Sequence, residues 1–130
     1  MRLGLDYHGI CDKYPEIFGP LSEALLAKGD QVYIITGHKD TPDFRADLEK
    51  LGIKYTEIVS VIDYHEKIGS HVWYDERGPW MDADLWNRSK AMLCEKYDID
   101  ILIDDSEVYG QYFTGKTKYI LLKGAAYNGR

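Results

Sequence analysis

The sequence predicts an α/β protein whose core is a mainly parallel, five-stranded sheet with helices on both faces. Two observations support this prediction. Short apolar runs alternate along the chain with longer segments whose apolar residues recur at a helical spacing. The run Gln31–Thr36 is apolar at nearly every position, which is typical of a strand buried on both faces of a parallel sheet. Right-handed crossovers between such strands place helices on both sides of the sheet.

Composition limits the class of protein. The 130 residues suit a single domain, 1–130, with a core of its own. The net charge of −6 argues against a nucleic-acid polymer as partner, because such binding requires a basic surface. No stretch approaches the roughly 20 apolar residues of a membrane span, and the first residues lack the layout of a secretory signal. We therefore expect a cytoplasmic protein with no membrane partner, and the sequence leaves a homo-oligomer open.

The first half of the chain is expected to contain three strands and two helices. A proline or threonine stands near the start of each helical segment and a glycine follows its end, as helix start and stop signals do. The expected elements are strand 2–6, helix 15–28, strand 31–36, helix 41–51 and strand 53–61.

The second half contains the least regular stretch. Residues 62–84 combine histidines and aromatic residues with a turn sequence at 75–79, and we expect a small irregular insert or flap with a short strand or hairpin. The remaining expected elements are helix 84–97, strand 100–105, a loop or short helix at 106–113, and strand 118–123.

Acidic residues stand at the ends of two predicted strands. Asp6 ends the first strand, and Asp104 and Asp105 end the fourth. Ligands of open α/β sheets bind outside the carboxyl ends of the strands. If these two strands are neighbours, three carboxylates meet at one edge, where like charges raise each other's pKa and destabilise the fold. A hard cation such as Mg²⁺ would resolve this conflict.

Two further residue types suited to phosphate binding are expected at the same edge. Thr36 and Gly37 follow the second strand and offer a hydroxyl and backbone N–H groups. Lys90, expected near the start of the third helix, offers an ammonium group. An acid, a hydroxyl, a lysine and an acid pair at strand ends together indicate a site that handles phosphate.

The order of these residues resembles the four motifs of the haloacid dehalogenase (HAD) superfamily of phosphohydrolases. The first motif, a strand ending in Asp-x-Asp-Gly, is matched by Asp-Tyr-His-Gly at 6–9. An apolar strand ending in threonine is found at 34–36, the motif lysine is best matched by Lys90, and a strand ending in an acid pair is found at 101–105. The resemblance spans most of the chain and implies a three-layer Rossmann-like fold. The short segment between Thr36 and Lys90 implies a minimal cap.

A narrower resemblance is to the 5′(3′)-deoxyribonucleotidase-like branch of that superfamily. There the acid pair is followed by a strand and then by Tyr-Asn near the C-terminus. This chain has the expected strand 118–123 and then Tyr127 and Asn128. The narrower resemblance implies a nucleotide as substrate.

The family resemblance implies a covalent mechanism on a small phosphorylated substrate. Asp6 would attack phosphorus and form an aspartyl-phosphate, which water then hydrolyses. Thr36, Gly37 and Lys90 would bind the phosphoryl oxygens and offset the charge that develops during transfer.

The resemblance also implies a set of ligands for Mg²⁺. These are the carboxylate of Asp6, the backbone carbonyl of His8, and a carboxylate from Asp104 or Asp105, the choice between the last two being open.

The departure from the family pattern is at residue 8. Family hydrolases usually carry aspartate there as the general acid and base, and this chain carries His8. Histidine is chemically able to transfer the proton, since its unperturbed pKa lies near about 6.5. The alternative is a catalytically lapsed HAD-like domain that binds a phosphorylated ligand or a protein partner.

Several other residues have two interpretations. Lys96 competes with Lys90 for the role of the motif lysine. Trp73, Tyr74 and Trp80 either form a flap that stacks on a base or serve ordinary packing.

Charged and histidine side chains outside these motifs are also open to two interpretations. Substrate contacts or exposed loop charge are the alternatives for His38, Lys39 and Arg77. His65 and His71 lack the spacing of metal ligands, so structural or surface histidines are favoured.

A response-regulator receiver domain is the rival phosphate-binding fold. It places its acid pair after the first strand, whereas here the single acid comes first and the pair comes late. This order disfavours the receiver domain.

Overall fold

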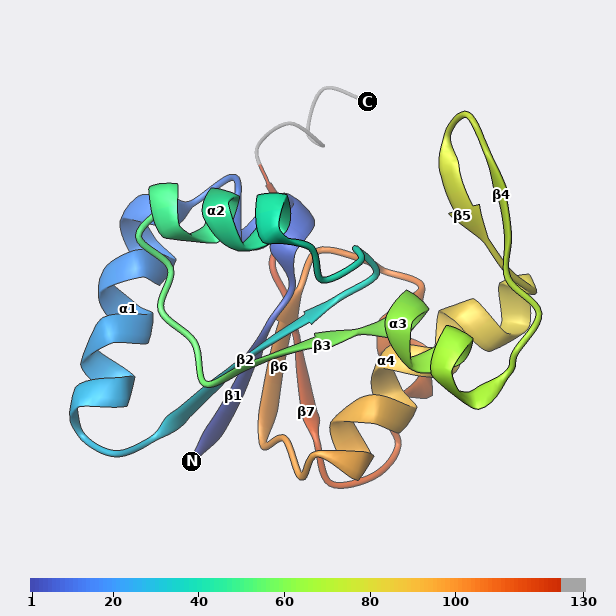
Figure 1. Cartoon of the computed structure of the whole chain (residues 1–130). Helices are drawn as coiled ribbons and strands as arrows, with labels where there is room; N and C mark the ends of the chain where they lie inside the picture. Colours follow the sequence, from blue (N-terminus) through green and yellow to red (C-terminus); the bar gives the residue numbers. More distant parts are fainter. Residues whose placement is uncertain (125–130) are drawn as a thin grey trace.

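The computed structural model describes residues 1–124 and contains a five-stranded sheet with the order β3-β2-β1-β6-β7 (Figure 1). Every pairing in this sheet is parallel, so the predicted parallel α/β architecture is confirmed. The strands are β1 (Arg2–Leu5), β2 (Gln31–Thr36), β3 (Glu57–Ser60), β6 (Ile101–Asp104) and β7 (Lys118–Leu121). Tyr127 and Asn128, which carry the narrower resemblance, lie outside the described residues.

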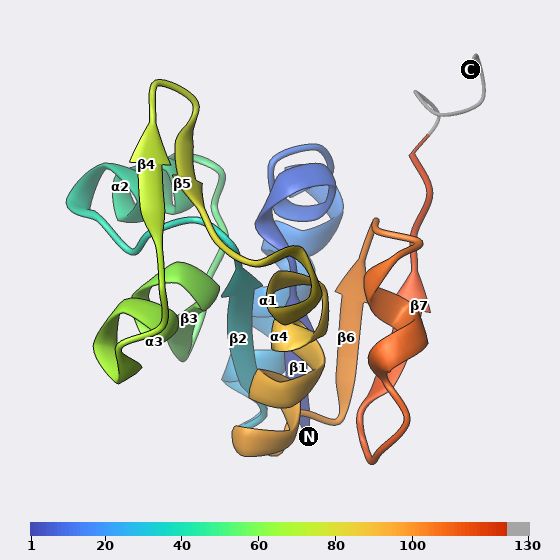
Figure 2. The ribbon, with the colours of Figure 1, turned by 90° about the vertical axis from the view of Figure 1, so that its right-hand side faces the viewer.

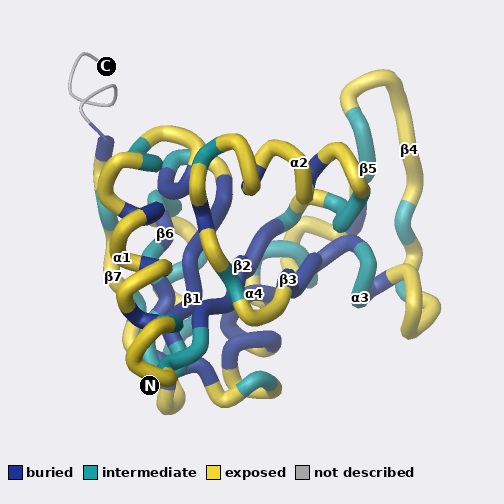
Figure 3. The backbone as a smooth tube through the Cα atoms, turned by 60° about the vertical axis from the view of Figure 1, so that its left-hand side comes forward, coloured by how far each residue is buried: buried dark blue, intermediate teal, exposed yellow. Residues whose placement is uncertain are grey.

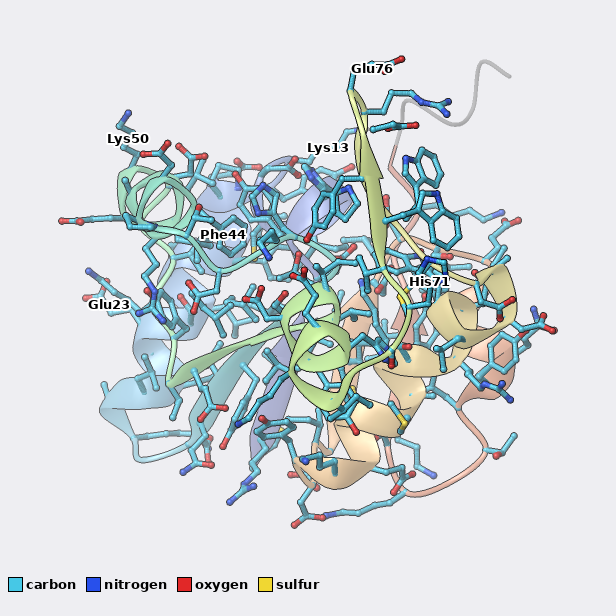
Figure 4. All side chains as sticks on the ribbon, turned by 45° about the vertical axis from the view of Figure 1, so that its right-hand side comes forward. Lys13, Glu23, Phe44, Lys50, His71 and Glu76 are labelled. Carbon is cyan, nitrogen blue, oxygen red and sulfur yellow. The ribbon has the colours of Figure 1, made fainter. Side chains whose placement is uncertain are left out.

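Helices pack on both faces of the sheet, as Figure 2 shows from the side. They are α1 (Pro15–Ala27), α2 (Pro42–Lys50), α3 (Val61–Ile68) and α4 (Ala83–Lys96). Phe18 of α1 and Phe44 of α2 belong to one core cluster, whereas Ile62 of α3 and Leu93 of α4 belong to another. In Figure 4 the labelled Phe44 lies beneath α2, on the side of the sheet.

Strand β2 shows why the sheet carries two cores. Val32 and Ile34 contribute to the cluster under α1 and α2, whereas Tyr33 and Ile35 contribute to the cluster under α3 and α4. Successive side chains of a strand point to opposite faces, so a run that is apolar at every position supplies both cores. Figure 3 shows β1 and β2 as buried segments surrounded by exposed helix surfaces.

The helix signals in the first half of the chain act as expected. The Thr41 hydroxyl accepts a hydrogen bond of 3.1 Å from the Phe44 N–H, and Pro42 opens α2. Gly29 and Gly52 follow α1 and α2 with φ angles of 94° and 74°, a region that favours glycine.

The expectation of irregular structure from residue 62 is wrong in its first part, because Val61–Ile68 form helix α3. Ser60 caps this helix by accepting a hydrogen bond of 3.1 Å from the Asp63 N–H, and Gly69 ends it in the left-handed conformation. The third strand, expected at 53–61, is shorter and spans Glu57–Ser60, ending where α3 begins. Two turns of helix carry too few apolar repeats to be told from an irregular segment by periodicity.

The hairpin expected within 62–84 is confirmed. Strands β4 (Trp73–Asp75) and β5 (Gly78–Trp80) pair antiparallel and form a separate two-stranded sheet. The hairpin rises beyond the carboxyl edge of the main sheet (Figures 1 and 2), and the labelled Glu76 lies at its tip in Figure 4.

The chain changes direction across the sheet at β1. Strands β1, β2 and β3 succeed one another toward one edge, and the chain then returns to place β6 and β7 on the other side of β1. The carboxyl ends of β1 and β6 thus flank the point where the strand order reverses, which is where α/β sheets open a crevice for ligands.

Between residues 1 and 124, the length and apolar content needed to cross a membrane are not found together in any helix.

Candidate functional site

A cleft of about 550 Å³ opens at the carboxyl edge of the sheet. Among the residues that line it are six of the predicted site residues: Asp6, His8, Thr36, Gly37, Lys90 and Asp105. The seventh, Asp104, is fully buried and is not part of the cleft lining, but its carboxylate accepts a hydrogen bond of 2.7 Å from Lys90.

Lys90 is the residue that joins the two acidic strand ends. Its Nζ lies 2.7 Å from Oδ1 of Asp6 and 2.7 Å from Oδ2 of Asp104. The side chain comes from the middle of α4, not from near its start as expected, and it is buried. Lys96, its competitor in the sequence, lies exposed in the last turn of the same helix.

Three carboxylates gather around this lysine. One oxygen from each of Asp6, Asp104 and Asp105 can be chosen so that all three lie within 4.8 Å of one another. Burial raises the pKa of Asp6 to about 7; the charges of Asp104 and Asp105 act in the same direction, and that of Lys90 opposes them. The three acids together exceed the charge of the one lysine, and hard carboxylate oxygens are the donors that Mg²⁺ prefers.

Lys90 stays positively charged in this surrounding. Burial alone would favour the neutral amine, but the carboxylates of Asp6 and Asp104 outweigh it and raise the lysine pKa above its usual value. Lys90 is therefore a permanent cation beside the carboxylate of Asp6.

Thr36 ends β2 and Gly37 follows it, and both line the cleft with Asp6 and Asp105. The Thr36 hydroxyl oxygen accepts a hydrogen bond of 3.0 Å from the His38 N–H, so its own proton can be donated into the cleft. The ring of Trp86 lies against Gly37 so closely that a Cβ at this position would collide with it. Gly37 therefore gives both a backbone N–H and the room that the indole ring needs.

Trp86 and Tyr109 line the cleft and were missed by the sequence analysis. The Trp86 indole N–H donates a hydrogen bond of 2.8 Å to the Tyr109 hydroxyl, and the Tyr109 ring centroid lies 5.2 Å from Nζ of Lys90. Trp86 stands four residues before Lys90, a spacing that places both on one face of a helix. That spacing was a usable signal, whereas nothing in the local sequence distinguishes Tyr109.

Gly9 allows the turn after β1 to approach the acid pair. Its φ of 83° lies in the left-handed region, and a Cβ added here would overlap the carboxylate of Asp105. The glycine of the first motif is thus required by both backbone conformation and space.

His8 lies at the rim of the cleft. Its side chain is 71% exposed, and Nδ1 lies 3.2 Å from Oδ2 of Asp12. The ring centroid of His38 is 6.2 Å away, and His38 itself stacks on Phe44. The imidazole of His8 therefore belongs to the lining of the same cleft as Asp6 and Asp105 but is open to solvent.

Two charged residues considered as substrate contacts, Lys39 and Arg77, are each paired with an acidic residue. Lys39 lines the cleft but pairs with Glu66 at 2.5 Å. Arg77 pairs with Asp75 and lies over Trp80, within the hairpin. Lys39 and Arg77 therefore pair with acids outside the cluster, whereas Lys90 pairs with Asp6 and Asp104.

The aromatic residues of the hairpin do not line the cleft. All three rings are exposed: Trp73, Tyr74 and Trp80. The residue of the hairpin that lines the cleft is Pro79. The hairpin therefore stands beside the cleft, with Tyr74 accepting a hydrogen bond of 3.4 Å from Nζ of Lys39 in the lining.

The two histidines considered for zinc are separate. His65 is buried, with Nδ1 2.8 Å from the Ser70 hydroxyl and Nε2 2.7 Å from the Ser89 hydroxyl, so the structural interpretation holds for it. His71 is exposed and lies beside Trp73.

Comparisons of the chain with protein-family models, with curated protein sequences and with solved structures gave no significant match.

Proposed function

We propose that this protein is a Mg²⁺-dependent phosphohydrolase of the HAD type that acts on a small phosphomonoester, such as a nucleotide, through an aspartyl-phosphate. The observation that carries the proposal is the position of Lys90. One buried ammonium contacts both Asp6 at the end of β1 and Asp104 at the end of β6. This arrangement joins the first, third and fourth motifs at one point.

The proposed HAD-type fold has a three-layer core and a minimal cap. The strand order and the position of the acids at the reversal point of the sheet support this assignment. The hairpin β4–β5 is the cap in this proposal, because it rises beside the cleft and contributes Pro79 to its lining.

The acidic cluster fits a divalent cation in charge and donor type. Asp6, Asp104 and Asp105 carry three negative charges when ionised, and Lys90 offsets one of them. In this proposal the ligands are carboxylates of this cluster and the backbone carbonyl of His8. Bound Mg²⁺ supplies charge that stabilises the phosphoryl oxygens during transfer.

Asp6 is the proposed nucleophile. Its Oδ1 accepts hydrogen bonds from Lys90 at 2.7 Å and from the Tyr7 N–H at 2.9 Å, so we assign the attack to Oδ2. The two donors hold the carboxylate in a fixed orientation, which favours a reactive geometry with the substrate.

Lys90, Thr36 and Gly37 are the proposed phosphate-binding groups. Lys90, from α4, and Thr36, from the end of β2, line the same cleft as Asp6. Their donors stabilise charge on the phosphoryl oxygens. His8 is the proposed acid and base in place of the usual aspartate.

The test is a phosphatase assay with Mg²⁺ on p-nitrophenyl phosphate and on a panel of nucleotides. We expect turnover that EDTA abolishes and that Asp6→Asn lowers by about a thousandfold or more, because the nucleophile is lost. Unchanged turnover in Asp6→Asn would contradict the proposal.

The alternative, a lapsed domain that binds a phosphorylated ligand or a protein partner, predicts a different result. Mg²⁺ would raise the melting temperature, no substrate would be turned over, and His8→Asp would restore activity. The same assay therefore separates the two functions.

A further inference from the structure

His8 and Asp12 form a hydrogen-bonded pair at the rim of the cleft. Nδ1 of His8 lies 3.2 Å from Oδ2 of Asp12. The other carboxylate oxygen, Oδ1, accepts a hydrogen bond of 2.7 Å from the Gly9 N–H. The Asp12 carboxylate therefore holds two consecutive residues of the turn that follows β1: the side chain of His8 and the backbone of Gly9.

The conformation of the turn brings the pair together. Residues Tyr7–Cys11 form a single wide turn, η1, interrupted at His8 with ψ of 127° and at Gly9 with φ of 83°. The Asp12 N–H closes the turn on the Tyr7 carbonyl at 3.1 Å. Because the chain folds back at Gly9, the carboxylate four residues after His8 comes to lie beside its ring.

This contact determines which ring nitrogen carries the proton. A carboxylate can only accept a hydrogen bond, so Nδ1 of His8 is the donor and carries a hydrogen. Nε2 is then the nitrogen that can give or take a proton. An acidic partner at Nδ1 orients an imidazole in this way in other proton-transfer sites.

The neighbouring histidine differs in its partner. Nδ1 of His38 lies 2.8 Å from the backbone carbonyl of Lys39, and the ring stacks on Phe44. A carbonyl oxygen can hold the Nδ1 hydrogen in the same way but carries no formal charge. Of the two histidines that line the cleft, His8 is therefore the one with an anionic partner.

We propose that Asp12 is a positioning residue that orients His8 for proton transfer in the phosphoryl-transfer reaction, an inference that rests on the proposed function. A His–Asp pair then takes the place of the single aspartate that the family pattern has at residue 8.

The proton transfers balance as follows. When Oδ2 of Asp6 bonds to phosphorus and the bond from phosphorus to the leaving oxygen breaks, the proton on Nε2 of His8 passes to that oxygen. His8 keeps the proton on Nδ1, held by Asp12. When the water oxygen bonds to phosphorus, one of its protons passes to Nε2 and the other stays on that oxygen, the bond from phosphorus to Asp6 breaks, and inorganic phosphate and the free carboxylate are formed.

The experiment compares Asp12→Asn with wild type on two substrates that differ in leaving group. Glycerol phosphate has a poor leaving group that requires a proton, whereas p-nitrophenolate departs without one. Asparagine keeps an oxygen for the Gly9 N–H but turns an amide donor toward His8, which moves the ring proton to Nε2. The loop contact is thus retained while the histidine tautomer changes.

The expected result is a difference between substrates in kcat/KM, which reports the steps up to cleavage of the leaving group. Asp12→Asn should lower kcat/KM for glycerol phosphate about 10- to 100-fold and that for p-nitrophenyl phosphate less than about threefold. Asp82→Asn is the matched control, since Asp82 also accepts a backbone N–H, from Leu85 at 3.0 Å, but has no histidine partner. It should leave both values unchanged.

A ¹⁵N NMR spectrum of the histidine rings gives a second readout that does not depend on turnover. Neutral His8 should be protonated at Nδ1 in wild type and should lose this preference in Asp12→Asn.

Three outcomes would overturn the assignment. Equal losses on both substrates would mean that Asp12 only supports the turn. Neutral His8 protonated at Nε2 in wild type would contradict the orienting contact. A wild type inactive toward both substrates would instead contradict the proposed function, and the role of Asp12 would fall with it.

Discussion

Lys90 is the residue on which the electrostatics of the cleft depend. Two buried carboxylates, Asp6 and Asp104, each lie 2.7 Å from its ammonium. A buried ion pair adds little net stability relative to apolar residues of the same size, because desolvation offsets the attraction. Removing only one partner, however, leaves buried charge without compensation. The cluster is thus sensitive to the loss of the lysine in a way that a surface pair is not.

Replacing Lys90 by methionine is expected to destabilise the metal-free protein by about 3–5 kcal/mol, because Asp6 and Asp104 lose their counter-charge. Chemical denaturation near neutral pH measures this change. The matched control is Lys96→Met in the exposed last turn of the same helix, which should shift stability by no more than about 0.5 kcal/mol. Equal effects of the two substitutions would contradict a central role for Lys90.

At the scale of single elements, the hairpin β4–β5 stands apart from both cores. The residues of β4 are exposed, and none of those in β4 or β5 belongs to the two core clusters. Helix α3, just before it, is by contrast packed into a core through Val61 and Ile62. The segment 61–80 therefore joins a structural helix to a peripheral hairpin, which contributes Pro79 to the cleft lining and contacts the lining residue Lys39 through Tyr74.

Replacing residues 73–80 by a two-glycine turn is expected to leave the fold intact, with a loss of stability below about 1 kcal/mol, because little apolar surface is buried there. If the hairpin is a minimal cap, KM for the preferred substrate should rise while the chemical step is retained. Circular dichroism, thermal melting and steady-state kinetics measure these effects. Collapse of the fold would show that the hairpin is part of the core after all.

On the scale of the whole molecule, the sheet concentrates negative charge at its carboxyl edge. The protein carries a net charge of −6, and three of its acids meet where β1 and β6 end. Burial raises the pKa of Asp6 from its ordinary 3.8 to about 7, further raised by its acidic neighbours and opposed by Lys90. Between these two values the folded state holds a proton that the unfolded chain has lost.

Asp6 is therefore expected to contribute a fall in the stability of the metal-free protein as pH rises from about 4 to about 7, because its carboxylate binds fewer protons in the unfolded state over this range. Burial lowers the pKa of His65, which acts in the opposite direction just below pH 6.5, so the Asp6 contribution is read as the difference from Asp6→Asn. The proposed Mg²⁺ site needs ionised carboxylates, so Mg²⁺ should raise the melting temperature more near about pH 8 than near about pH 5. At a hundredfold excess over Kd the gain should be about 2.7 kcal/mol. Thermal melts with Mg²⁺ or EDTA at both pH values measure this.

Asp6→Asn provides the control for this pH dependence. The substitution removes the ionisable group that shifts, so the fall in stability between about pH 4 and about 7 should be reduced and the effect of Mg²⁺ weakened. Absence of a Mg²⁺ effect in wild type at every pH would contradict the proposed metal site.

The sequence by itself determined the parallel α/β sheet and the residues that meet at its carboxyl edge. It could do so because both depend on local properties: the doubly apolar run of β2 requires burial on two faces, and residues at the ends of parallel strands share an edge whatever the details of packing. Helix α3 was missed because its two turns contain too few apolar repeats to give a periodic signal.

Only the tertiary structure decided which side chains touch. It chose Lys90 over Lys96, buried Asp104 beneath the cleft, set Trp86 and Tyr109 into its wall, and brought Asp12 to His8. Each of these contacts depends on how a helix or turn is rotated and packed against the sheet, and on a backbone angle at Gly9 that sequence spacing does not reveal. Spacing along the chain places residues on an element, whereas packing between elements determines their partners.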